Sequence, residues 1–136
     1  RDACRDGLWE ELRSGAFSSA HLHFPATFGA GDVLLVENAV SRLASKPPVP
    51  IEIERDEVQG CVFVDRIDHD WVRSVADLPA GSGERLFESW IAAYREQELR
   101  DPEWAMPENR ALGSRLIDVC RSAVEERQDL VMVWIL

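Results

Sequence analysis

Three histidines are the side chains of this chain best suited to metal binding or acid–base catalysis. His21 and His23 lie two residues apart, in a segment where polar and apolar residues alternate. If that segment is a strand, both imidazole rings point to the same face. Two histidines and one carboxylate could hold zinc or another divalent ion and leave a position open for water. The same spacing also fits an ordinary solvated strand face.

The third histidine, His69, lies between two aspartates. Asp68 precedes apolar residues at helical spacing, so its carboxylate is well placed to cap a helix. Asp70 would then lie in the first turn, where the helix dipole favours negative charge. These structural roles compete with a metal site, and the sequence leaves both open. A metal-dependent hydrolase would take its ligands from His21, His23, Asp65, Asp68, His69 and Asp70.

A second candidate site is the acidic, aromatic stretch between Tyr94 and Glu108, where Arg95 and Arg100 only partly offset the negative charge. Tyrosine and tryptophan anchor protein interfaces, and carboxylates speed the encounter with a basic partner. Alternatively, the charges only cover helix exteriors and Trp104 pins the connecting segment to the core. The candidate partner-binding residues are Tyr94, Glu98, Asp101, Glu103 and Trp104.

Other catalytic chemistry has little support in the sequence. No Gly-x-Ser-x-Gly motif is present. Cys4, Cys61 and Cys120 are odd in number and far apart, which argues against a disulfide framework and a four-cysteine zinc site. The glycine-bearing stretch 80–84 lacks the lysine of a P-loop, so it fits a linker better than an anion cradle. We therefore expect no cofactor.

The charge of the chain limits the kinds of partner it can bind. With 25 acidic and 15 basic residues, its net charge is −10. Such a surface repels phosphate backbones, so we expect no nucleic-acid binding, and it steers basic partners toward it. The sequence has no run of about 18 apolar residues, which is the length that would indicate a membrane span. The absence of a leader pattern and the few cysteines predict a cytoplasmic protein, and the preference for arginine over lysine indicates a bacterial source.

The clearest structural pattern lies in the C-terminal segment that begins at Pro107. Leu112, Leu116 and Cys120 recur at helical spacing, and the seven residues 130–136 are apolar without a break. A short apolar run rich in Val, Ile and Trp predicts a strand buried on both faces, which we expect to be central in its sheet.

The remaining pattern predicts one α+β domain over residues 1–136, with a mixed sheet of about four strands and helices packed on it. Residues 33–36 fit a strand as well as a helix, and 55–60 is expected to join two strands as a hairpin. Asp32 is expected to cap a helix. Helices are expected at about 2–14, 32–45 and 84–99, and from about 68 and 107; strands are expected at 19–24, 49–54, 61–65 and 130–136.

Taken together, these patterns favour a small acidic binding protein that acts by contact with a basic protein partner. An immunity protein or antitoxin that inhibits a basic toxin, such as a nuclease, is the concrete form. The alternative is the metal-dependent hydrolase built on His21 and His23. The sequence does not indicate the oligomeric state.

Overall fold

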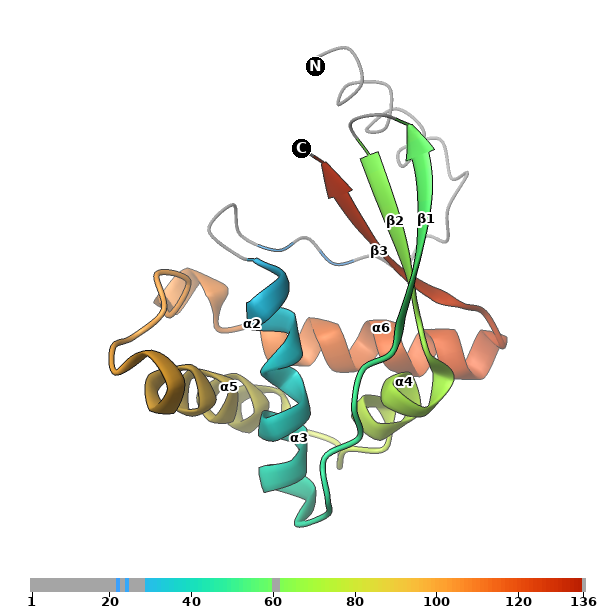
Figure 1. Cartoon of the computed structure of the whole chain (residues 1–136). Coiled ribbons are helices and arrows are strands. Elements are labelled where there is room, and N and C mark those ends of the chain that lie inside the picture. Colours follow the sequence, from blue (N-terminus) through green and yellow to red (C-terminus); the bar gives the residue numbers. More distant parts are fainter. Residues whose placement is uncertain (1–21, 23, 25–28, 60–61, 136) are drawn as a thin grey trace.

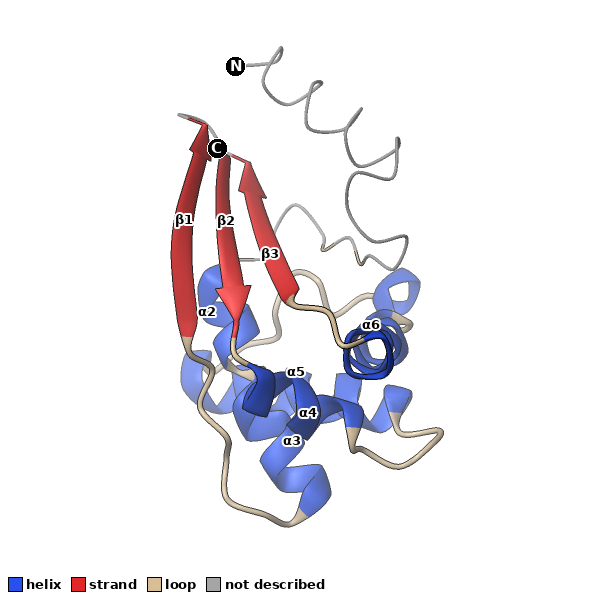
Figure 2. Cartoon of the chain, turned by 90° about the vertical axis from the view of Figure 1, so that its right-hand side faces the viewer, coloured by secondary structure: helices blue, strands red, loops and turns tan. Residues whose placement is uncertain are grey.

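The computed structural model describes residues 22, 24, 29–59 and 62–135. The fold is α+β, with helices gathered at one end and an antiparallel sheet extending from them (Figures 1 and 2). Within the described residues, no helix is both long and apolar enough to cross a membrane. In chain order the elements are α2 (Ala30–Leu34), α3 (Val36–Ala44), β1 (Ile53–Gln59), β2 (Val62–Ile67), α4 (His69–Ala76), α5 (Gly83–Glu98), the 3-10 helix η1 (Pro107–Asn109), α6 (Leu112–Glu126) and β3 (Leu130–Ile135).

The sheet has the strand order β1-β2-β3, and both neighbouring pairs are antiparallel. β2 is therefore central among the described strands, and the C-terminal strand β3, which was expected to be central, lies at the edge of these three. The apolar run predicted buried side chains, whereas the order of strands depends on backbone pairing, which side-chain type does not encode. Met132 is buried, while Leu130, Val131 and Val133 are only partly buried.

The predicted number of about four strands is not confirmed. Three strands are present in the part of the chain that the structure describes. The strand expected at 19–24 and the helix expected at 2–14 lie outside that part, apart from Leu22 and Phe24, which belong to neither helix nor strand.

The hairpin between β1 and β2 was predicted correctly, but its limits differ. β1 begins at Ile53, four residues after the expected start, and continues to Gln59 through the stretch predicted to be a loop. Pro48 and Pro50 explain the late start, because proline offers no N–H for strand pairing. An irregular register between Glu57 and Gln59 lies close to the turn.

Helices α2 and α3 occupy residues 30–34 and 36–44 with Leu35 between them, which resolves the two alternatives for residues 33–36 in favour of a helix. Asp32 was expected to be the N-cap of this helix, but it is not. Gly29 holds that position, and Asp32 Oδ2 accepts a hydrogen bond from the Gly29 N–H at 2.8 Å. The carboxylate therefore supports the same helix start from inside the first turn. Trp90 Nε1 donates to the Asp32 carbonyl oxygen at 2.7 Å, which ties this turn to α5.

Two glycines allow α5 and α6 to cross closely. A Cβ atom on Gly113 would lie 2.1 Å from the Gly83 carbonyl oxygen, and one on Gly83 would lie 1.8 Å from Ser114 Oγ. The crossing therefore needs glycine at both positions. Gly83 was expected to belong to a linker, and the structure gives it a role in helix packing instead.

The core lies mainly between the helices and takes in Ile67 and Met132 from the sheet. Arg121 of α6 also fixes the end of α4, because its Nε donates to the Ala76 carbonyl oxygen at 3.1 Å. The largest fully buried side chains include three tryptophans, Trp71, Trp90 and Trp104.

Candidate protein-binding surface

The connector between α5 and α6 is held by an aromatic cluster. Trp104 lies at its centre, with ring centroids 5.2 Å from Trp90, 5.8 Å from Phe87 and 6.2 Å from Tyr94. Its side chain is only 1% exposed. The buried position of the indole agrees with the interpretation that Trp104 anchors the connector to the core. A large aromatic side chain that bends back onto two helix turns buries more apolar area than it could on the surface.

Backbone hydrogen bonds shape the connector itself. The Ala105 N–H donates to the Pro102 carbonyl oxygen at 3.0 Å, and the Met106 N–H donates to the Trp104 carbonyl oxygen at 2.8 Å. Asn109 Nδ2 donates to the same Trp104 oxygen at 2.9 Å. Together with the buried indole, these bonds give the connector a defined shape before any partner arrives.

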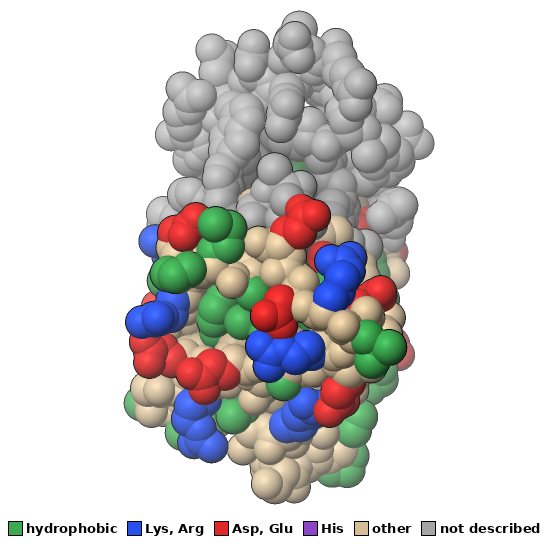
Figure 3. Space-filling model, turned by 90° about the vertical axis from the view of Figure 1, so that its left-hand side faces the viewer, with side chains coloured by type: hydrophobic (Ala, Val, Ile, Leu, Met, Phe, Trp, Pro, Cys, Tyr) green, Lys and Arg blue, Asp and Glu red, His purple; other side chains and the backbone are tan. Residues whose placement is uncertain are grey.

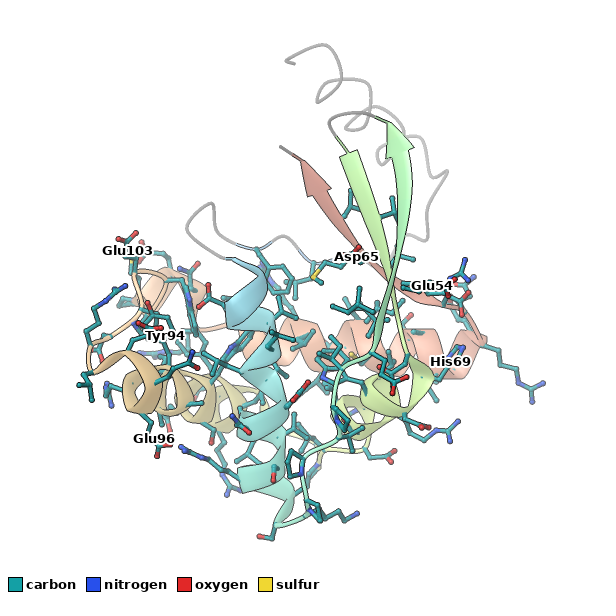
Figure 4. All side chains as sticks on the ribbon, in the orientation of Figure 1. Glu54, Asp65, His69, Tyr94, Glu96 and Glu103 are labelled. Carbon is teal, nitrogen blue, oxygen red and sulfur yellow. The ribbon has the colours of Figure 1, made fainter. Side chains whose placement is uncertain are left out.

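Acidic side chains are exposed along this connector and the last turns of α5. Figure 4 shows Tyr94, Glu96 and Glu103 at this end of the molecule. Glu96 pairs with Arg42 of α3. Within the described part of the chain, no ion pair or hydrogen bond engages the carboxylates of Glu98 and Glu103, which are both exposed.

The basic residues of this surface are engaged with their neighbours. Arg95 Nε lies 2.5 Å from Asp101 Oδ1. This hydrogen bond lowers the pKa of Asp101 and raises the pKa of Arg95. The guanidinium of Arg100 lies 5.5 Å from the centroid of the Tyr94 ring. Tyr94 is thus partly buried between Trp104 and Arg100, and only part of its ring could meet a partner.

Seen from outside, this end of the molecule is mixed rather than uniformly acidic. Acidic, basic and apolar side chains alternate over it (Figure 3). Arg95 and Arg100 each have a local contact. Like Glu108 farther along the chain, Glu98 and Glu103 have exposed carboxylates that no partner among the described residues engages. We call Glu98 and Glu103, with the connector between them, the connector surface.

The second candidate site, at the base of the sheet, has a structural explanation. Asp68 is the N-cap of α4, as predicted, and its Oδ2 accepts the Trp71 N–H at 3.1 Å. Its Oδ1 accepts the Glu52 N–H at 2.8 Å. Both oxygens therefore have backbone donors, which satisfies polar groups that a helix start and a strand entry would otherwise leave unpaired.

The neighbouring histidine is also engaged. His69 Nε2 lies 3.1 Å from Asp129 Oδ1, and Arg66 Nε lies 3.6 Å from Asp129 Oδ2. Asp65 is buried in β2, and Asp70 lies in the first turn of α4. Among the described residues, no three His, Cys, Asp or Glu side chains are grouped so that they could hold a metal ion. His21 and His23 lie outside those residues.

Cys120 is unsuited to nucleophilic catalysis. Its thiol is free and fully buried in α6. Burial raises the pKa of Cys120 to about 12, so the reactive thiolate is scarce near neutral pH. This agrees with the structural role predicted for it. Cys4 and Cys61 lie outside the described residues.

Comparison of this chain with protein-family models, with curated proteins and with solved structures gives no match. The function is therefore inferred from two regions, the connector surface and the base of the sheet. At the first, Glu98 and Glu103 are exposed carboxylates without a partner among the described residues, as is Asp70 at the second.

One surface residue was missed in the sequence pattern. Leu99 was expected to be the last residue of a helix, but it lies just beyond α5 in the left-handed conformation, at φ 60°. Its side chain is 89% exposed. The sequence does show that the helix expected at 84–99 ends without a glycine. Apolar spacing alone, however, could not show that the Leu99 side chain is exposed.

Proposed function

We propose that this chain is a binding protein that acts by contact with a basic protein partner, as an immunity protein or antitoxin does when it inhibits a basic toxin. The observation that supports this most directly is the pair Glu98 and Glu103. Both carboxylates are exposed, and neither has a partner among the described residues. Carboxylates of this kind are free to pair with arginine or lysine of another protein.

The shape of the connector supports the same proposal. Trp104 and the backbone hydrogen bonds fix the segment that carries Glu103, so little conformational freedom is lost when a partner binds. The net charge of −10 adds long-range attraction for a basic protein. Such attraction raises the association rate and makes the affinity depend on salt.

The hydrolase alternative gains no support from the described residues. It combines His21 and His23, which lie outside them, with Asp68 or His69. The side chains of Asp68 and His69 already contact backbone N–H groups and Asp129, respectively. A binding protein is therefore the one function that we propose.

Charge reversal at the connector tests the proposal. We would immobilise the wild-type chain and Glu98→Lys/Glu103→Lys, and compare the proteins that each retains from an extract of the source cells. We expect a basic protein on the wild type that the variant does not retain. With that protein purified, charge reversal should lower the affinity at low salt at least about tenfold.

A matched control separates the connector surface from net charge alone. Glu125 and Glu126 are exposed at the C-terminal end of α6, which lies at the opposite side of the molecule (Figure 1). Glu125→Lys/Glu126→Lys changes the charge by the same amount and should leave retention of the partner nearly unchanged. Equal retention by the wild type and the connector variant, or equal loss in both variants, would contradict the proposal.

A further inference from the structure

We propose that Leu99 is the apolar anchor of the connector surface, and that the occupant is a segment of the partner with an apolar side chain between arginines or lysines. This inference rests on the proposed function and adds the chemistry of the segment that binds. It is carried by the exposure of Leu99, its backbone conformation and its position beside Glu98.

Leu99 is exposed far more than the other large hydrophobic side chains described. It is 89% exposed, while the others in the exposed class are 40–47% exposed. An isolated exposed leucine is ordinary on a protein surface. Exposure becomes informative here because the backbone at the same residue is also unfavourable for leucine.

Three described helices end at a residue other than glycine with a positive φ: Ser45 at 52°, Leu99 at 60° and Arg127 at 53°. Glycine is favoured at such an end because a Cβ atom is strained there. Ser45 and Arg127 are polar and remain hydrated. Leu99 combines the backbone strain with an apolar side chain in water, so glycine at this position would give a more stable fold.

The neighbours of Leu99 indicate the chemistry of its occupant. Glu98 directly precedes it, and Glu103 follows on the same connector. Arg95 pairs with Asp101 and Arg100 lies over the Tyr94 ring, and neither forms an ion pair with these two carboxylates. An apolar side chain that covers Leu99 would therefore be flanked best by cations, which is the pattern we assign to the partner.

A second copy of this chain is a less suitable occupant. Two copies with a net charge of −10 each repel one another. Burying a leucine between like-charged surfaces would gain little. The basic segment satisfies the apolar and the charged parts of the surface together.

The test uses a synthetic twelve-residue peptide, with one leucine between pairs of arginines, as the probe. Leu99→Gly removes the anchor and places glycine where φ is positive, so the melting temperature should not fall. We expect binding of the probe to weaken about tenfold in this variant. In the wild type, the probe should shift the methyl NMR signals of Leu99.

Arg127→Gly is the matched control, since it relieves a positive φ at the end of α6 and leaves the connector intact. It should bind the probe as the wild type does. A probe with serine in place of its leucine should bind the wild type about tenfold more weakly than the leucine probe does. If Leu99→Gly binds the leucine probe as tightly as the wild type, or if the Leu99 methyl signals do not move, the inference is wrong.

The outcomes separate this inference from the proposed function. If Glu98→Lys/Glu103→Lys weakens binding of the partner protein and Leu99→Gly does not, the function stands and the apolar anchor is wrong. If neither variant weakens it, both are wrong. A wild-type dimer in sedimentation that Leu99→Gly converts to a monomer would identify a second copy as the occupant and overturn the inference.

Discussion

The two ends of this molecule use carboxylates in different ways. At the base of the sheet, Asp68 accepts two backbone N–H groups, and Asp129 contacts Arg66 and His69. At the connector, Glu98 and Glu103 are exposed without a partner among the described residues, as Figure 4 shows for the position of Glu103. Acidic residues that complete the fold are already occupied, so the available ones are the better candidates for binding.

This comparison predicts opposite phenotypes. Changes at the base of the sheet should lower stability and leave binding intact, whereas changes at the connector surface should do the reverse. Trp104 is the exception, because it belongs to the core and also positions the connector.

The largest effect is expected for Trp104→Ala. Removing a buried indole leaves a cavity between Phe87, Trp90 and Tyr94, and should lower the free energy of unfolding by about 3–5 kcal/mol. Urea denaturation followed by circular dichroism measures this change. A loss below about 1 kcal/mol would contradict the role given to Trp104 as the centre of the cluster.

Asp68→Ala should have the next largest effect. The substitution leaves the N–H groups of Trp71 and Glu52 without their acceptor and should reduce stability by about 1–2 kcal/mol. Affinity for the basic partner should not change. Thermal unfolding and a binding titration on the same sample check both parts, with Asp70→Ala as a milder control in the same first turn. Weakened binding in Asp68→Ala would break the comparison between the two ends.

Glu98→Lys/Glu103→Lys should show the reverse behaviour. Both side chains are exposed and form no hydrogen bond or ion pair within the described part of the chain, so the free energy of unfolding should change by no more than about 0.5 kcal/mol. Partner binding should nevertheless fall. Denaturation curves for the wild type and the variant should then coincide, and a clear loss of stability would mean that these carboxylates also support the fold.

The smallest effect concerns the pair Arg95 and Asp101. The hydrogen bond from Arg95 lowers the pKa of Asp101 from its ordinary value of 3.8. Because the folded state holds the lower pKa, the pair contributes to stability above the unfolded pKa, and the contribution is lost as the pH falls through the folded pKa. The contribution is small because the pair is exposed.

An NMR titration of the Asp101 carboxyl carbon measures this effect. Its midpoint should lie below 3.8 in the wild type and move toward that value in Arg95→Gln. A midpoint at or above 3.8 in the wild type would show that the ion pair does not persist in solution.

The sequence predicted local elements better than their arrangement. The cap at Asp68 and the helix that became α5 depend on side chains close in the chain, so their pattern was sufficient. The position of β3 at the edge of the three described strands depends on which strand pairs with β2, and an apolar run does not encode that choice.

The candidate surface was predicted in part for the same reason. The acidic residues Glu98 and Glu103 could be named from charge alone, but burial of Trp104 depends on distant helix turns. Exposure of Leu99 depends on how the backbone leaves α5, which apolar spacing does not report.

The measurement that tests the central claim most directly is amide NMR mapping of the labelled chain, titrated with the purified basic partner. We predict that the perturbed amides cluster in residues 94–106, while those at 66–70 and 129 stay unchanged. Perturbations centred on the base of the sheet, or spread evenly over the acidic surface, would contradict the claim that Glu98, Glu103 and the connector between them form the binding site.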